Sequence, residues 1–122
     1  MPLLNDFYTI REITQGDRYL ISIELNPEHE IYKGHFPGNP VVPGVCQTQI
    51  VKECIEKIKG INIMLVSGDN IKFTAVLNPE KNKEVSISLL IKEKEGGIIY
   101  ADATIAAPNT QFFSFKGNFK EM

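Results

Sequence analysis

The chain has 122 residues, with 13 basic and 15 acidic side chains and a formal net charge of −2. This length suits one domain with a single core, and the small negative charge argues against a nucleic-acid partner held by phosphate contacts. The amino-terminal residues have no basic region, and no stretch approaches the ~20 apolar residues that span a bilayer, so we expect a cytoplasmic protein without a membrane partner.

Two strands are predicted near the start of the chain. Residues 7–13 read as a short strand, and residues 18–25 alternate polar and apolar side chains as a half-buried strand does. Pro27 and the acidic residues after it end that run. His29 lies among these acids in a predicted turn, and we interpret it as a structural or solvated residue.

A stiff loop follows in the stretch GHFPGNPVVPGV, residues 34–45. Pro37, Pro40 and Pro43 each fix φ and restrain the residue before them. Gly34, Gly38 and Gly44 allow turns or a close approach of a ligand to the backbone. Such a loop can hold His35 in one place relative to the element that follows.

One segment is strongly helical, from Pro43 or Gly44 to about Lys59, with Gly60 as a plausible C-cap. Its apolar residues recur at helical spacing. They are Cys46, Ile50, Val51, Cys54, Ile55 and Ile58. The first N–H groups of a helix lack partners inside it and, with the helix dipole, form a site for negative charge. A histidine there would be a general acid/base beside an oxyanion site, and the alternative is a rigid turn with a spectator histidine.

The two cysteines, Cys46 and Cys54, both fall on the predicted helix. Eight residues separate them by ~12 Å along the helix axis, which is too far for a disulfide. A CxxC-type spacing is also absent, so we expect reduced thiols and no metal site.

Strands dominate the rest of the chain. The candidates are residues 61–67, 70–77, 84–93, 98–107 and 112–119. Gly96 and Gly97 predict a hairpin turn between the third and fourth of these. The result is an α+β fold with one long helix and an antiparallel sheet of five or six strands. Because one helix covers only one face of such a sheet, we expect dimerisation.

The run HEIYKGHFPGNPVVPGV, residues 29–45, resembles the β-hydroxyacyl-acyl-carrier-protein dehydratases of the hotdog fold, whose hallmark is HFPG-x-P-x-x-PGV. A weaker match, SGDNIKFTAVLNP at residues 67–79, is similar to the family's strand with a Lys-Phe pair and a nearby proline. The resemblance covers most of the chain. It implies a single hotdog domain over residues 1–122, a long central helix wrapped by a curled antiparallel sheet, and homodimers or larger assemblies with an acyl tunnel at the dimer interface.

The resemblance also implies a reaction, the dehydration of a β-hydroxyacyl thioester on acyl carrier protein to the trans-enoyl thioester, in fatty-acid or polyketide-like synthesis. No cofactor is implied beyond the phosphopantetheine that carries the substrate. By the same resemblance His35 is the base, the N–H of Gly44 polarises the thioester carbonyl, and the carbonyl of Val41 orients the imidazole. Phe36 and Val45 are implied to line the acyl channel.

The chain departs from the family where the acid is expected. That Glu or Asp lies fourteen positions after the histidine, and here the position holds Gln49. Glu53, one helical turn further on, would reach a substrate ~6 Å deeper in the tunnel. It equally fits a solvated helix face, and only burial by a second subunit would make it an acid. A water held by Gln49, or His35 itself, are the other sources of the proton.

Three hypotheses about function therefore stay open. The chain is a working dehydratase, a half-site subunit whose sister chain supplies the acid, or a catalytically impaired module that binds acyl carrier protein. A hotdog thioesterase is a weaker fourth, because those enzymes rely on a carboxylate that this site position lacks.

Overall fold

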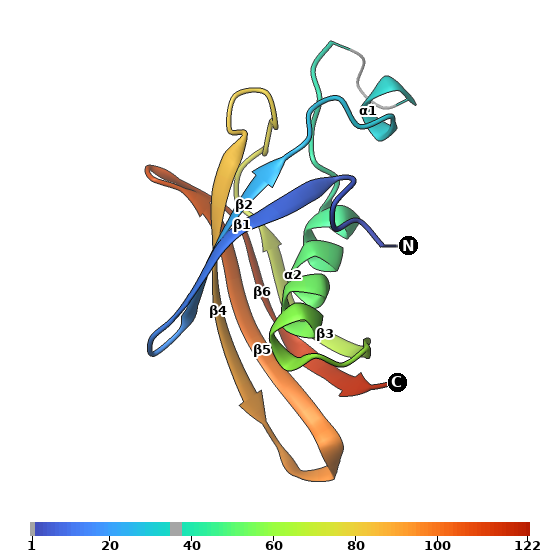
Figure 1. The fold of residues 1–122 in the computed structure, drawn as a ribbon, viewed down its shortest axis with the longest axis vertical. Helices are drawn as coiled ribbons and strands as arrows, with labels where there is room; N and C mark the ends of the chain where they lie inside the picture. The colour runs from blue at the N-terminus through green and yellow to red at the C-terminus, as the bar shows by residue number, and fades with distance from the viewer. Residues whose placement is uncertain (1, 35–37) are drawn as a thin grey trace.

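The structure, a computed structural model, describes residues 2–34 and 38–122. One long helix lies along one face of a curled antiparallel sheet (Figure 1), as the predicted α+β hotdog fold requires. The elements are β1 (Tyr8–Gln15), β2 (Tyr19–Leu25), α1 (Ile31–Gly34), α2 (Gly44–Lys59), β3 (Ile63–Phe73), β4 (Glu84–Glu93), the 3-10 helix η1 (Glu95–Gly97), β5 (Ile98–Ala107) and β6 (Thr110–Glu121).

The sheet has the strand order β1-β2-β4-β5-β6-β3, and every neighbouring pair is antiparallel. Its register keeps apolar side chains on the same face, since Ile21 pairs with Ile13 on one side and with Ile87 on the other. The ends of the sheet are β1 and β3. Any continuation of the sheet by another chain would therefore have to use one of these two strands.

The long helix begins and ends where the sequence predicts. Pro43 is its N-cap with an extended backbone, and Gly60 ends it in the left-handed conformation at φ 70°. The N–H of Gly60 donates to the carbonyl of Glu56 at 2.8 Å, which satisfies one of the last carbonyls. Five predicted apolar residues of the helix are buried. They are Cys46, Ile50, Val51, Cys54 and Ile55.

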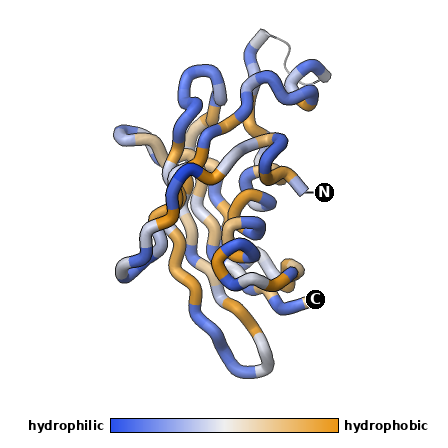
Figure 2. Tube along the Cα trace, viewed as in Figure 1, coloured by the Kyte–Doolittle hydropathy of each residue, from blue (hydrophilic) through white to orange (hydrophobic). Residues whose placement is uncertain are grey.

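The core lies between α2 and the sheet. Apolar residues follow the central strands, and the loops at both ends of the sheet are hydrophilic (Figure 2). Four phenylalanines of β6 are buried: Phe112, Phe113, Phe115 and Phe119. The rings of Phe115 and Phe119 pack with centroids 5.6 Å apart. This burial of aromatic area supplies much of the hydrophobic stabilisation of the fold.

Two expected elements differ from the structure. The predicted strands at residues 61–67 and 70–77 are one strand, β3, which passes the turn-forming sequence Gly68-Asp69-Asn70 by irregularities in its pairing with β6. Gly117 of β6 makes this possible, because a Cβ there would collide with the carbonyl oxygen of Ser67. The short helix α1 was not predicted. The Gly96-Gly97 turn is confirmed, with φ of 75° and 74°.

Candidate functional site

The amino end of α2 offers hydrogen-bond donors. The N–H groups of Cys46 and Gln47 donate to the carbonyl of Pro43 at 3.0 and 3.1 Å, and no side chain caps the helix. Gly44 and Val45 have no partner for their N–H groups within residues 2–34 and 38–122. Two adjacent free amides at a helix start favour a negatively charged or strongly polarised oxygen.

A phenyl ring lies directly beside these amides. A Cβ atom built on Gly44 would be 2.5 Å from Cζ of Phe73, so glycine is needed for the ring to rest against the helix. The ring also packs on Phe113, with centroids 5.3 Å apart, yet Phe73 is 57% exposed. The two sequence segments that carried the resemblance, one ending at Val45 and the other containing Phe73, thus meet at the start of α2.

Of the other loop residues with a predicted role, the structure describes Val41. Val41 is half-buried, and its carbonyl accepts no hydrogen bond from the part of the chain that is described. The next residue is pinned, because the N–H of Val42 donates to the carbonyl of Leu77 at 2.9 Å. His35 and Phe36, the predicted base and channel residue, lie outside the described residues.

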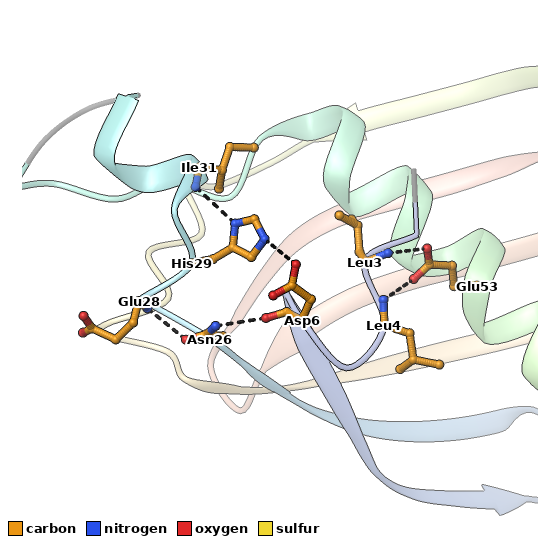
Figure 3. A network of polar contacts seen from close by, with 8 residues as sticks. All are labelled: Leu3, Leu4, Asp6, Asn26, Glu28, His29, Ile31 and Glu53. Carbon is orange, nitrogen blue, oxygen red and sulfur yellow. Dashed lines mark hydrogen bonds and ion pairs between the residues drawn. The ribbon is translucent and has the colours of Figure 1, made fainter.

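Glu53 is buried by its own chain. The main-chain N–H groups of Leu3 and Leu4 donate to its two carboxylate oxygens at 2.7 and 2.9 Å (Figure 3). The hydroxyl of Tyr8 donates at 2.9 Å and Nε2 of Gln49 at 2.8 Å. Glu53 is only 6% exposed, so the alternative of a solvated helix face is wrong, and its burial comes from its own chain rather than from a second subunit.

This network gives the Glu53 carboxylate a structural task. Each of its oxygens accepts two hydrogen bonds, and together they attach the start of the chain to α2. A carboxyl group that donated a proton to a substrate would need a protonated oxygen, and protonation here would displace one of the four donors. Burial, then the neighbouring Cys54 and Glu53, raise the pKa of Tyr8 far above its usual value, so the phenol stays a donor.

His29 also has a structural position. Its Nδ1 accepts the N–H of Ile31 at 3.1 Å, and its Nε2 lies 3.1 Å from the carboxylate of Asp6 (Figure 3). An acceptor at Nδ1 places the proton of the neutral ring on Nε2, which then donates to Asp6. The ring packs edge-on against Phe7 at 5.1 Å. His29 therefore joins the loop after β2 to the amino-terminal segment.

Both cysteines are free and buried. Burial raises the pKa of the Cys46 thiol, and burial together with Glu53 raises that of Cys54 to about 12. A raised pKa keeps a thiol protonated at neutral pH, so we expect neither cysteine to react with a disulfide reagent in the native protein. Both should react after unfolding in guanidinium chloride, as measured by the absorbance of the released thiolate. Rapid labelling of either thiol in the native protein would contradict this account.

Across the described ranges, no group of three or more His, Cys, Asp or Glu side chains is arranged to hold a metal ion. Among the helices of those same ranges, none is both long enough and apolar enough to cross a membrane.

The edge strand β3 carries an unusual apolar surface, which we call the apolar edge. Its members are Met64, Leu65, Val66, Ile71 and Phe73, each between 38% and 57% exposed. Val45 and Val76 are 68% and 69% exposed. The opposite edge strand, β1, instead exposes polar and charged residues such as Arg11 and Glu12. Because Phe73 touches Gly44, the apolar edge borders the amino end of α2.

Comparison with known proteins gives a consistent result. The profile of the ApeI-like family, described as ApeI dehydratase, matches residues 11–116. The 3-hydroxyacyl-[acyl-carrier-protein] dehydratases FabZ of Oenococcus oeni and Clostridium acetobutylicum are each 25% identical to this chain over 103 residues. These matches cover 79% of the chain and 74% and 73% of the relatives.

Solved structures share the fold. An uncharacterized protein from Erwinia carotovora subsp. atroseptica has a TM-score of 0.66 at 21% identity, covering 93% of this chain and 94% of that one. The dehydratase heterocomplex ApeI:P from Xenorhabdus doucetiae contains a chain with a TM-score of 0.66 at 20% identity, covering 92% and 96%. The E. coli PaaI protein has a TM-score of 0.63 at 7% identity, covering 94% and 79%. At these identities the likeness establishes the hotdog fold.

Proposed function

Since the chain belongs to the ApeI-like dehydratase family, we propose that it removes water from a β-hydroxyacyl thioester carried on acyl carrier protein and forms the trans-enoyl thioester. One observation carries this proposal: the N–H groups of Gly44 and Val45, which have no partner among the described residues, start the helix that comes after the HFPG sequence. The substrate arrives on the phosphopantetheine arm of its carrier, so the chain needs no cofactor of its own.

The chemistry assigns each group a task. Removing the α-proton places negative charge on the thioester oxygen, and the N–H of Gly44 stabilises that charge. His35 is the base that takes the proton, with its ring oriented by the carbonyl of Val41. As the β-hydroxyl leaves, the imidazolium returns the same proton to it, so water departs and the histidine is regenerated. Phe36, Phe73 and Val45 line the apolar slot for the acyl chain.

The proton is assigned to His35 because neither Gln49 nor Glu53 offers a free carboxylate. Gln49 is an amide and does not release a proton near neutral pH. Glu53 is fully engaged by four donors. Within this proposal Gln49 holds the β-hydroxyl in place, and the reaction runs more slowly than in relatives that carry a carboxylate at this position.

The proposal includes a second copy of the chain across the apolar edge. Because the outer edge of β3 has no neighbouring strand and is apolar, a second β3 would extend the sheet and cover Val45. We expect Val66→Asp to give a monomer in analytical ultracentrifugation, because a charge would be buried without a partner. The circular dichroism of the monomer should be unchanged, since Val66 is 48% exposed in a single chain.

Ile13→Asp on the opposite edge strand is the matched control. Ile13 is 37% exposed on β1, and the proposal leaves that edge in solvent. This variant should keep the oligomeric state of the wild type. A Val66→Asp protein that remained dimeric would refute the placement of the interface on β3.

The substitution Gly44→Ala tests the site at the start of α2. The added methyl group would displace the ring of Phe73, and misalignment of about 1 Å beside the oxyanion donors costs up to about 10²-fold in rate. We expect kcat for dehydration to fall by one to two orders of magnitude on that basis. The melting temperature should change little, because the exposed ring is able to swing outward.

Gly16→Ala is the control for this substitution, since a Cβ there approaches only the carbonyl oxygen of Arg18, at 3.8 Å. It should leave both rate and stability unchanged. Full activity in Gly44→Ala would show that the start of α2 is not the reacting centre.

A second candidate function follows from the solved heterocomplex with the same fold. This chain would then be a half-site subunit that supplies His35, while a carboxylate on the helix of a sister chain supplies the proton. Activity that appears only when a second hotdog chain is added would favour this candidate. Tight binding of acyl carrier protein without any turnover would instead indicate a catalytically impaired carrier-binding module.

A further inference from the structure

The amide of Gln49 is oriented by its neighbour on the next turn of α2. Nε2 of Gln49 donates a hydrogen bond to Oε2 of Glu53 at 2.8 Å. A carboxylate only accepts hydrogen bonds, so the amide has to turn its NH2 group toward Glu53. The carbonyl oxygen of Gln49 is therefore directed away from Glu53.

Glu53 is held too firmly to follow a rotation of this amide. Its Oε2 also accepts the N–H of Leu3 at 2.7 Å, and its Oε1 accepts the N–H of Leu4 and the hydroxyl of Tyr8, both at 2.9 Å. These donors come from residues 45 to 50 positions away in the sequence, and Glu53 is 6% exposed. The carboxylate is thus a fixed acceptor. Of the two orientations of the Gln49 amide, it allows only the one in which the NH2 group faces Glu53.

Gln49 lies on the side of the helix where the site begins. It follows Val45 by four residues, and residues at that spacing share one helix face. Gln49 is half-buried, whereas Glu53, one turn further on, is closed off by the start of the chain. Of the two polar side chains, only Gln49 keeps an atom, its Oε1, that is free of the amino-terminal network.

We propose that Glu53 is a positioning residue that makes Gln49 a hydrogen-bond acceptor toward the substrate, and that the site thereby selects β-hydroxyacyl over β-oxoacyl thioesters. This inference rests on the proposed function, since it places the β-substituent beside Gln49. A β-hydroxyl donates its proton to Oε1 of Gln49 and keeps its lone pairs free for the proton from His35. A β-oxo group has no proton to donate, so two acceptors would face each other without a hydrogen bond.

Binding of two unreactive substrate analogues tests the selection. The probes are the 3-hydroxyoctanoyl and 3-oxooctanoyl amides of pantetheine, titrated into the purified full chain by calorimetry. The wild type should bind the hydroxy amide at least about tenfold more tightly than the oxo amide, because the oxo complex leaves one buried acceptor without a hydrogen bond. Glu53→Gln should lose most of this ratio, because the new amide at position 53 is able to donate to Oε1 of Gln49 and turn the Gln49 amide around.

Tyr8→Phe is the matched control. It removes one donor from Oε1 of Glu53 and leaves the bond to Gln49 in place, so it should lower the melting temperature and keep the wild-type binding ratio. If the role of Glu53 were only structural, Glu53→Gln and Tyr8→Phe would change the melting temperature and the binding ratio in the same way. If Glu53→Gln does not fold, Gln49→Leu serves instead, since it removes the acceptor at a half-buried position and should bring the ratio close to one.

The outcomes separate the inference from the function on which it rests. Wild-type protein that binds both amides equally, or a Glu53→Gln or Gln49→Leu variant that keeps the wild-type ratio, would overturn the inference and leave the dehydratase proposal standing. Wild-type protein that binds neither amide would overturn the proposed function and the inference together.

Discussion

His35→Ala is expected to lower kcat for dehydration by about 10³-fold, within the range typical of losing a general acid/base. In the proposed reaction His35 both takes the α-proton and returns it to the leaving hydroxyl. No other group takes over, because Gln49 is not an acid and Glu53 is engaged with the start of the chain. The measurement is the formation of enoyl-acyl carrier protein from the β-hydroxyacyl form, followed by mass spectrometry.

The other histidine of the chain provides the control. His29→Ala removes the contacts with Asp6 and Ile31, so it should lower the melting temperature. Its activity per folded molecule should stay near that of the wild type. A comparable loss of activity in His35→Ala and His29→Ala would mean that the effect of His35→Ala is structural. The assignment of His35 as the base would then be wrong.

Exchanging Gln49 and Glu53 of α2 is expected to have the second large effect. In the double variant Gln49→Glu/Glu53→Gln, a carboxylate occupies the position that the family uses for its acid. The new amide at position 53 keeps its oxygen in the place of Oε1, where it accepts from Leu4 and Tyr8, and turns its NH2 toward the new carboxylate. The N–H of Leu3 loses its acceptor, so the melting temperature should fall. We expect dehydration to accelerate on the order of 10²-fold, because a separate acid now protonates the leaving hydroxyl.

The single variants show whether the exchange itself matters. Gln49→Glu alone puts two carboxylates within hydrogen-bond distance, so its melting temperature should fall and its activity should rise less than in the double variant. Glu53→Gln alone adds no acid and should give no acceleration. If the double variant folds but is no faster than the wild type, position 49 does not face the leaving hydroxyl.

The helix and most strands were predictable because local signals agree with the fold. Pro43 and Gly60 mark the two ends of α2 through backbone conformations that few other residues provide as readily. The pairing β4–β5 follows from alternating residues around Gly96-Gly97. The division of β3 was wrong because Gly68-Asp69-Asn70 is typical of a turn, while the space that lets the strand continue comes from Gly117 on β6.

The site was predictable only where it depends on the loop sequence. The N–H groups of Gly44 and Val45 lack helix partners because the helix starts there. The burial of Glu53 does not follow from the helix sequence, because its partners Leu3, Leu4 and Tyr8 are brought to it by tertiary structure rather than by helical spacing. Periodicity within α2 assigns Glu53 to a polar face, and nothing in that pattern shows that the start of the chain covers it.

The central claim is that this chain dehydrates its substrate with its own histidine and helix amides. The most direct test is to incubate the wild-type chain, purified alone, with β-hydroxyacyl-acyl carrier protein and to follow the enoyl product over time. We predict slow but catalytic turnover that falls by about 10³-fold in His35→Ala. Bound carrier with no enoyl product, even with the enzyme in excess, would contradict it.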